Sequence, residues 1–209
     1  MIRSFDLRDL ALVRRLSEGG IPLYTESALT DGLHPLRSAL FGIVGGDFPT
    51  FVWKADEGKG AGFIQLQLEA SEHHAHIAFL SSASDDSGKG ANGSHPPDVE
   101  ATWLHLLDRA VVEVGRRGVH SLVAEVPESG IELPILRRAG FAVYTRQDIW
   151  RRDGVAKPAS AKENLLSLRQ SVDEWEIQLL YANLIPRLVQ LVEPEPPLHH
   201  GSMWVLREM

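Results

Sequence analysis

The chain has 209 residues, of which 44% are hydrophobic and 23% are charged, and both fractions are typical of a folded globular protein. Its formal net charge is −7. It therefore lacks the excess of Lys and Arg that holds a phosphate backbone, and we expect no nucleic-acid partner. The absence of cysteine excludes disulfides, thiolate nucleophiles and zinc–thiolate cages. The length fits one domain with an appendage better than two full domains.

The N-terminal residues contain no sorting signal that we recognise. Met1 to Asp9 carries charges where a secretory signal needs an apolar core, and no segment reaches the roughly 18 apolar residues of a membrane span. We therefore expect a cytoplasmic protein without a membrane partner.

The first half of the chain predicts two helices and an antiparallel meander. Ile2 to Phe5 is expected to form a strand, followed by an N-cap at Asp6 and a helix that ends at Gly19-Gly20. A second helix is predicted from Pro35 to Val44, since proline suits a first helical turn. Three strand-like runs follow: Thr50 to Ala55, Gly62 to Leu68 and His74 to Leu80.

The second half alternates helices and strands after a polar segment. Residues 81–97 read SSASDDSGKGANGSHPP, which is typical of a functional loop or of a disordered one. The expected elements are then an amphipathic helix from Val99 to Gly118, a strand from Val119 to Val126, a short helix from Ile131 to Ala139 and one or two strands from Phe141 to Trp150. This order predicts an α/β domain with a mixed sheet.

A small and polar segment, residues 153–164, is typical of a linker, so we predict a domain at 1–152 and an extension at 165–209. The extension contains a helical region from Val172 to Val192, which Pro186 should divide. Asp9 to Pro22 and Asp173 to Pro186 have the same spacing. Two interpretations stay open: a helical tail, or the start of a second copy of the domain. Gly201 to Met209 has the pattern of a strand that begins.

The stretch Arg137-Arg138-Ala139-Gly140-Phe141 closes the short helix, and the whole element order resembles the GNAT superfamily of acyl-CoA-dependent N-acyltransferases. The resemblance covers about residues 1 to 152 and is strongest from Trp103 to Tyr144. It implies an α/β (α+β) fold with a mixed, mostly antiparallel central sheet flanked by helices. It also implies acetyl-CoA as co-substrate, lying between the strands at His74 to Leu80 and Ser121 to Val126, with an amine attacking the thioester.

The resemblance further implies that the end of the fourth strand and the glycine-rich run after it hold acetyl-CoA. The candidate residues are Phe79, Leu80, Ser81, Gly88, Lys89, Gly90 and Gly93. This run departs from the family signature because Ser94 to Pro97 separates it from the helix, where Asp98 and Glu100 would repel a pyrophosphate. A mobile surface loop is the other interpretation of the run.

The catalytic candidates are Tyr144, His76 and Glu125. Many members of the family place a tyrosine four residues before the glycine of Gly140-Phe141, and that position is Leu136 here. Tyr144 on a predicted strand could act as the acid, and His76 or Glu125 as the base. Each also has a purely structural interpretation: Tyr144 as a packing residue, His76 as part of a polar strand face and Glu125 as a solvated strand end. His74 and His76 share a strand face, but no third ligand has a recognisable spacing, so we predict no metal.

The leading hypothesis is an N-acetyltransferase that acts on a small-molecule or peptide amine. The alternative is a catalytically silent domain of the same fold that binds a small ligand or a protein partner. The sequence identifies no particular acceptor, and a homodimer is left open as an assembly state.

Overall fold

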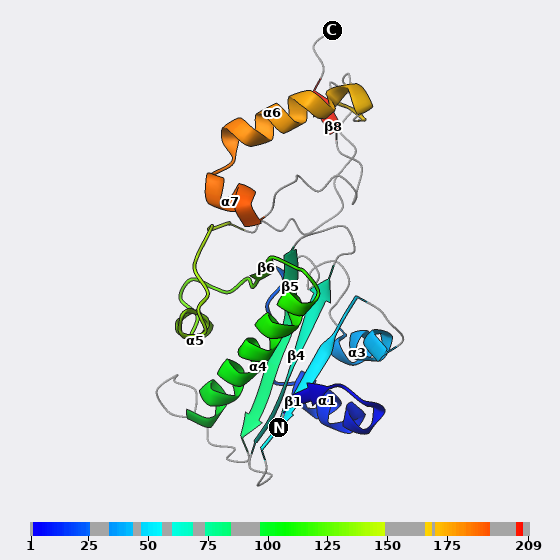
Figure 1. The fold of residues 1–209 in the computed structure, drawn as a ribbon, viewed down its shortest axis with the longest axis vertical. Coiled ribbons are helices and arrows are strands. Elements are labelled where there is room, and N and C mark those ends of the chain that lie inside the picture. The colour runs from blue at the N-terminus through cyan, green and yellow to red at the C-terminus, as the bar shows by residue number, and fades with distance from the viewer. Residues whose placement is uncertain are drawn as a thin grey trace, which may run out of the picture. The chain divides into compact units, whose positions relative to one another are not determined.

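A computed structural model describes residues 2–25, 34–43, 47–55, 60–68, 74–84, 97–148, 166–168, 170–192 and 204–206 (Figure 1). The chain divides into two compact units, Met1–Ala142 and Val143–Met209. The predicted linker at 153–164 lies outside the described residues.

The first unit is built around one mixed sheet. Its strands run in the order β1-β3-β4-β5-β2, with β6 also pairing with β5. All pairs are antiparallel except β5 with β6. The strands are β1 Ile2–Ser4, β2 Ile21–Pro22, β3 Thr50–Lys54, β4 Gly60–Leu68, β5 His74–Ser84 and β6 Ser121–Val123.

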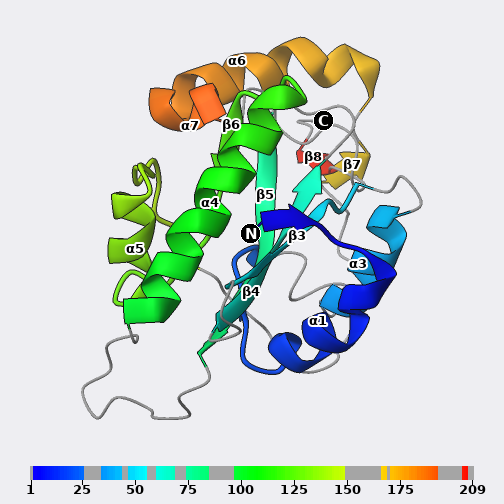
Figure 2. The same ribbon diagram turned by 60° about the horizontal axis from the view of Figure 1, so that its bottom comes forward.

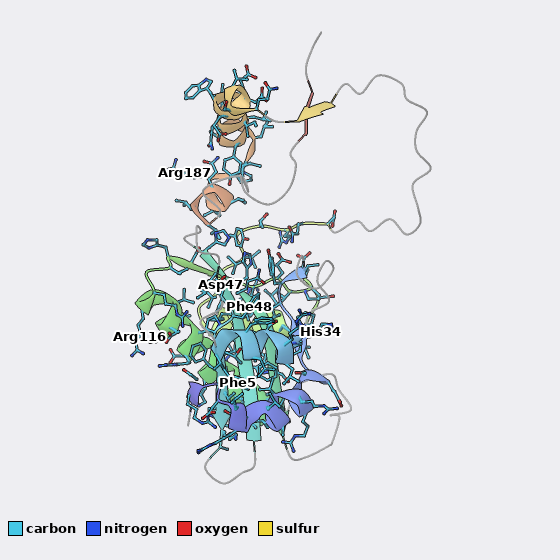
Figure 3. The ribbon with its side chains drawn as sticks, turned by 90° about the vertical axis from the view of Figure 1, so that its right-hand side faces the viewer. Phe5, His34, Asp47, Phe48, Arg116 and Arg187 are labelled. Carbon is cyan, nitrogen blue, oxygen red and sulfur yellow. The ribbon has the colours of Figure 1, made fainter. Side chains whose placement is uncertain are left out.

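Helices cover both faces of this sheet, with α4 on one face and α1 and α3 on the other (Figures 1 and 2). The helical elements are the 3-10 helix η1 Leu7–Asp9, α1 Leu10–Ser17, α3 Pro35–Ile43, α4 Pro97–Arg116 and α5 Glu132–Arg138. Trp103, Leu106 and Leu107 of α4 are buried against Ile64 and Leu80. On the opposite face, a second apolar cluster joins Val13, Leu16, Val52, Phe63 and Phe79. Phe5, labelled in Figure 3, packs at its edge.

Close approach of α4 to the sheet depends on a glycine. A Cβ atom on Gly62 would lie 2.7 Å from the carbonyl oxygen of Ser81 and 2.7 Å from Cγ2 of Thr102. Glycine at this position of β4 therefore lets the helix and the neighbouring strand pack more closely than any larger residue would allow.

The second unit contains β7 Leu166–Leu168, the 3-10 helix η2 Ser171–Asp173, α6 Glu174–Leu184, α7 Arg187–Val192 and β8 Trp204–Leu206. β7 and β8 form a two-stranded antiparallel sheet. The break predicted at Pro186 is confirmed, because α6 ends at Leu184 and the following Ile185 has extended backbone. The strand expected near the end of the chain is confirmed as β8.

The predicted fold class is confirmed: the sheet is mixed, mostly antiparallel and flanked by helices. The prediction of strands from Phe141 to Trp150 is wrong for residues 141–148, which form no strand, while 149–150 lie outside the described residues. The strand predicted from Val119 to Val126 is confirmed only at Ser121–Val123. So short a strand offers little edge for the next one to pair with.

Candidate functional site

β5 and β6 separate after three paired residues, and this divergence is the centre of the candidate site. The strands pair in parallel from His74 opposite Ser121 to His76 opposite Val123. Two residues further on, Leu23 lies between them: its N–H donates to the carbonyl oxygen of Ala78 (3.2 Å), and its carbonyl oxygen accepts from the N–H of Glu125 (2.8 Å). Leu23 thus acts as a wedge that holds the strands apart.

A β-bulge lies at the same level of β5. Gln65 of β4 pairs with Phe79, whereas the next residue, Leu66, pairs with Ile77, so Ala78 has no partner on β4. A bulge bends a strand and redirects its backbone groups, and such features are common beside active sites. Here the redirected carbonyl group of Ala78 is the one that accepts from Leu23.

The wedge belongs to β2, an element that our reading of the sequence missed. Ile21 and Pro22 pair with Leu80 and Phe79, which places β2 on the edge of β5. Gly20 permits the approach, because a Cβ atom there would lie 2.8 Å from Cβ of Ser81 and closer still to the Phe79 ring. A strand of two residues is too short to show an alternation of apolar and polar residues in the sequence. The one available signal was the combination of Gly20 with Pro22, a residue that sheets tolerate at edges.

An aromatic stack covers the start of the divergence. The Tyr24 ring stacks on the His76 ring with centroids 4.1 Å apart, and His74 meets His76 edge-on at 5.1 Å. All three side chains are at most 9% exposed. The carboxylate of Glu125, which is half-buried, accepts a hydrogen bond from the backbone N–H of Thr25 (2.9 Å). Both the predicted histidine and the predicted glutamate therefore reach the segment Leu23–Thr25, although the sequence separates them by 49 positions.

The other predicted residues lie as follows. Tyr144 is half-buried on irregular backbone and belongs to the second unit, so its proposed role as acid stays a prediction. Phe79 and Leu80 bury their side chains on opposite faces of the sheet, and the Ser81 hydroxyl donates to the Leu16 carbonyl oxygen (2.6 Å). The backbone of Phe79 and Leu80 is already paired with β4 on one edge and with β2 on the other, so of these three residues only Ser81 could offer backbone groups to a cofactor. The predicted glycine-rich residues Gly88, Lys89, Gly90 and Gly93 lie outside the described residues.

The residues present fit one part of acetyl-CoA and not another. Beyond Leu80, Ser81–Ser84 pairs with β4 on one side, and no strand among the described residues pairs with its other edge, which suits the amide groups of a pantetheine arm. The start of α4 does not suit a pyrophosphate, because Pro97 has no N–H and Glu100 forms an ion pair with Arg138. Leu136, at the family's tyrosine position, is buried in the core.

The described residues contain no group of three His, Cys, Asp or Glu side chains arranged to hold a metal ion. Within the same part of the chain, no helix is both long enough and apolar enough to cross a membrane.

The element order, the mixed sheet and the β5–β6 divergence together reproduce the architecture that the resemblance implied. The fold is GNAT-like. Neither a protein-family model nor a curated protein matches the sequence. Among solved structures, the chain is similar to an aminoglycoside N-acetyltransferase, AAC(6')-Iy, in complex with CoA. The identity is 13% and the TM-score 0.47, and the match covers 74% of this chain and 100% of that one. It is also similar to a tetramutant of the BH1408 protein from Bacillus halodurans, with 13% identity and a TM-score of 0.46, over 73% and 99% of the two chains.

Proposed function

We propose that the first unit is an acyl-CoA-dependent N-acyltransferase that transfers an acetyl group from acetyl-CoA to an amine. The observation that carries this proposal is the divergence of β5 and β6 at the Ala78 bulge, with His76 and Glu125 meeting at the segment that separates the strands. The element order from α4 to Gly140-Phe141 supports the same reaction class.

The donor would lie against the edge of β5 beyond Leu80. Backbone groups of Ser81–Ser84 can pair with the pantetheine amides as another strand would. Acetyl-CoA, when bound, supplies an acyl carbon that is activated as a thioester. The pyrophosphate would have to be held away from the first turn of α4, where Glu100 places a carboxylate.

Glu125 is the residue that we assign to proton removal. An amine is protonated near neutral pH and must lose its proton before it can attack a thioester. The Thr25 N–H fixes the carboxylate of Glu125 at the divergence, in a half-buried position that still leaves it accessible. His76, whose ring stacks on Tyr24 and meets His74 edge-on, is more deeply buried than Glu125, and we assign it to positioning of the segment Leu23–Thr25.

A second candidate function is a silent domain that binds a ligand without catalysis. Two observations favour it: Ile21–Leu23 already occupies the β5 edge at Ala78–Leu80, and Leu136 replaces the usual tyrosine acid. Under this alternative, a ligand would bind without turnover.

Titration calorimetry with acetyl-CoA and with CoA separates the two functions, followed by a thiol-release assay over a panel of amines. The acyltransferase proposal predicts binding of both and turnover with at least one amine. Replacement Glu125→Gln should then lower kcat by about 100-fold, since a general base contributes 10²–10⁴, and should leave acetyl-CoA affinity within about twofold. Glu18→Gln, at an exposed position after α1, is the control. Binding without turnover would favour the silent domain, and absence of binding at millimolar ligand would rule out the acyltransferase.

A further inference from the structure

The elements of the second unit repeat those at the start of the first in the same register. A shift of 164 residues carries β1 onto β7, the 3-10 helix η1 onto η2, the first residue of α1, Leu10, onto the first residue of α6, Glu174, and Pro22 onto Pro186. One coincident spacing would be weak evidence. Here the same shift relates the bounds of the strand, the bounds of the 3-10 helix, the start of the following helix and a proline, with no insertion between them.

The capping geometry of the two 3-10 helices is also the same. In each, an aspartate in the third position turns back to accept from the backbone N–H of the N-cap residue. Asp9 accepts from Asp6 at 3.2 Å, and Asp173 accepts from Gln170 at 2.8 Å. The N-cap residues have φ and ψ of −127° and 159° in the first unit and −120° and 165° in the second. Both aspartates are buried, at 0% and 9% exposure.

Sheet pairing extends the correspondence. β1 pairs antiparallel with β3, from Ile2 opposite Trp53 to Ser4 opposite Phe51. β7 pairs antiparallel with β8, from Leu166 opposite Leu206 to Leu168 opposite Trp204. β8 is therefore the counterpart of β3, and the second unit has the strand, 3-10 helix, helix and returning strand of the first.

The first unit also indicates what should cover this arrangement. There, β4 pairs with the second edge of β3, and Val13 and Leu16 of α1 are buried against Phe63 of β4 and Phe79 of β5. The equivalents of Val13 and Leu16 are Ile177 and Leu180, and Leu180 is 59% exposed. Other exposed apolar side chains of the second unit are Val172, Trp175, Leu179, Leu184, Leu188 and Leu191. Among the described residues, β8 pairs with β7 alone.

We propose that residues 166–206 form the opening half of a second copy of the fold, and that their apolar face docks a β-hairpin of the β4–β5 type. One strand of this hairpin adds antiparallel to β8. Its apolar side chains, at alternate positions, pack on Ile177 and Leu180 as Phe63 and Phe79 pack on Val13 and Leu16. The proposal concerns the second unit and does not rest on the acyltransferase assignment.

The test supplies such a hairpin to the full chain. Residues 55–142, which carry β4 through α5, are appended after Met209, so that the added β4 follows β8 as β4 follows β3. We expect hydrogen exchange in α6 to slow by at least tenfold and a second cooperative unfolding transition to appear. The same extended chain with aspartate replacing both residues equivalent to Phe63 and Phe79 in the added copy should lose both effects.

Point variants of the extended chain test the docking surface on α6 independently. Leu180→Asp in the extended chain should abolish the protection of α6, whereas Leu7→Asp, at a similarly exposed leucine of η1, should not. An added segment that stays unstructured, or an α6 whose exchange does not slow, overturns the proposal. So does a dimer of the unextended chain, detected by sedimentation, that Leu180→Asp dissociates, because a second copy would then be the occupant.

Discussion

Asp9 is a fully buried carboxylate that joins three elements of the first unit. Its Oδ1 atom lies 2.7 Å from Arg3 of β1 and 3.0 Å from Lys54 of β3, and its Oδ2 accepts from the Asp6 backbone. Burial alone would raise the pKa of Asp9, but the hydrogen bonds from Lys54, Asp6 and Arg3 outweigh it and hold this pKa below the usual 3.8. Because the pKa of Asp9 is lower in the folded state than in the unfolded state, the ionised carboxylate stabilises the fold above the unfolded-state pKa. This stabilisation is lost as the pH falls through the folded-state pKa.

The replacement Asp9→Asn should therefore lower the free energy of unfolding by about 1–3 kcal/mol at pH 7, the usual cost of losing hydrogen bonds to a buried charged group. Urea denaturation at pH 7, 5 and 3.5 measures the difference between the variant and the wild type. That difference should shrink between pH 5 and 3.5. If it stays constant over this range, the carboxylate charge does not contribute as described.

Leu23 bridges the divergence of β5 and β6 with its backbone, and its side chain, 1% exposed, belongs to the apolar core. Leu23→Ala should cost about 2–5 kcal/mol, as large-to-small replacements in cores do. Leu7→Ala, at a 63% exposed position, should change stability by less than about 0.5 kcal/mol. Guanidinium denaturation of both variants tests this, and equal small effects would mean that the wedge is not part of the core.

The sequence could predict two of the residues at this site and not the one that joins them. Glu125 and His76 were candidates because a carboxylate or an imidazole can take up a proton, and both lie at the divergence, while their catalytic roles stay predictions. Leu23 resembled any apolar loop residue. Its role depends on hydrogen bonds to Ala78 and Glu125, 55 and 102 positions away, and only the folded backbone brings them together.

At the scale of elements, long periodic segments were predictable and short paired ones were not. The 20-residue helix α4 and the strands β3 to β5 carry their own periodicity, so the sequence predicts them well. β2 and β6, with two and three residues, exist because β5 offers them an edge. Residues 141–148 have a strand-like composition but form no strand, since strand formation depends on a partner more than on local preference.

Replacing two glycines by alanine should change the stability of the protein in opposite directions. Gly62→Ala should destabilise the protein by about 1–3 kcal/mol, because the new Cβ would press on the Ser81 backbone and on Thr102 of α4. Gly115→Ala, at an exposed position near the end of α4, should stabilise it by about 0.5–1 kcal/mol, since no atom beyond the adjacent residues and the helix's own backbone lies within 4 Å of the new Cβ and alanine favours a helix. Thermal unfolding of both variants compares them, and a neutral Gly62→Ala would show that α4 tolerates a wider spacing.

At the scale of the whole molecule, both apolar clusters of the first unit draw their side chains from Ile2 to Phe141. A chain that ends at Arg152 should therefore keep the main unfolding transition within about 3 °C of the full chain, a shift that corresponds to roughly 1 kcal/mol for a domain of about 150 residues. A chain that ends at Arg116 lacks Val123, Ile135 and Leu136 and should show no cooperative transition. Differential scanning calorimetry on the three chains measures this directly. Loss of the transition in the chain ending at Arg152 would mean that the first unit needs residues after 152 to fold. That result would contradict the inference that its core is complete within Ile2 to Phe141.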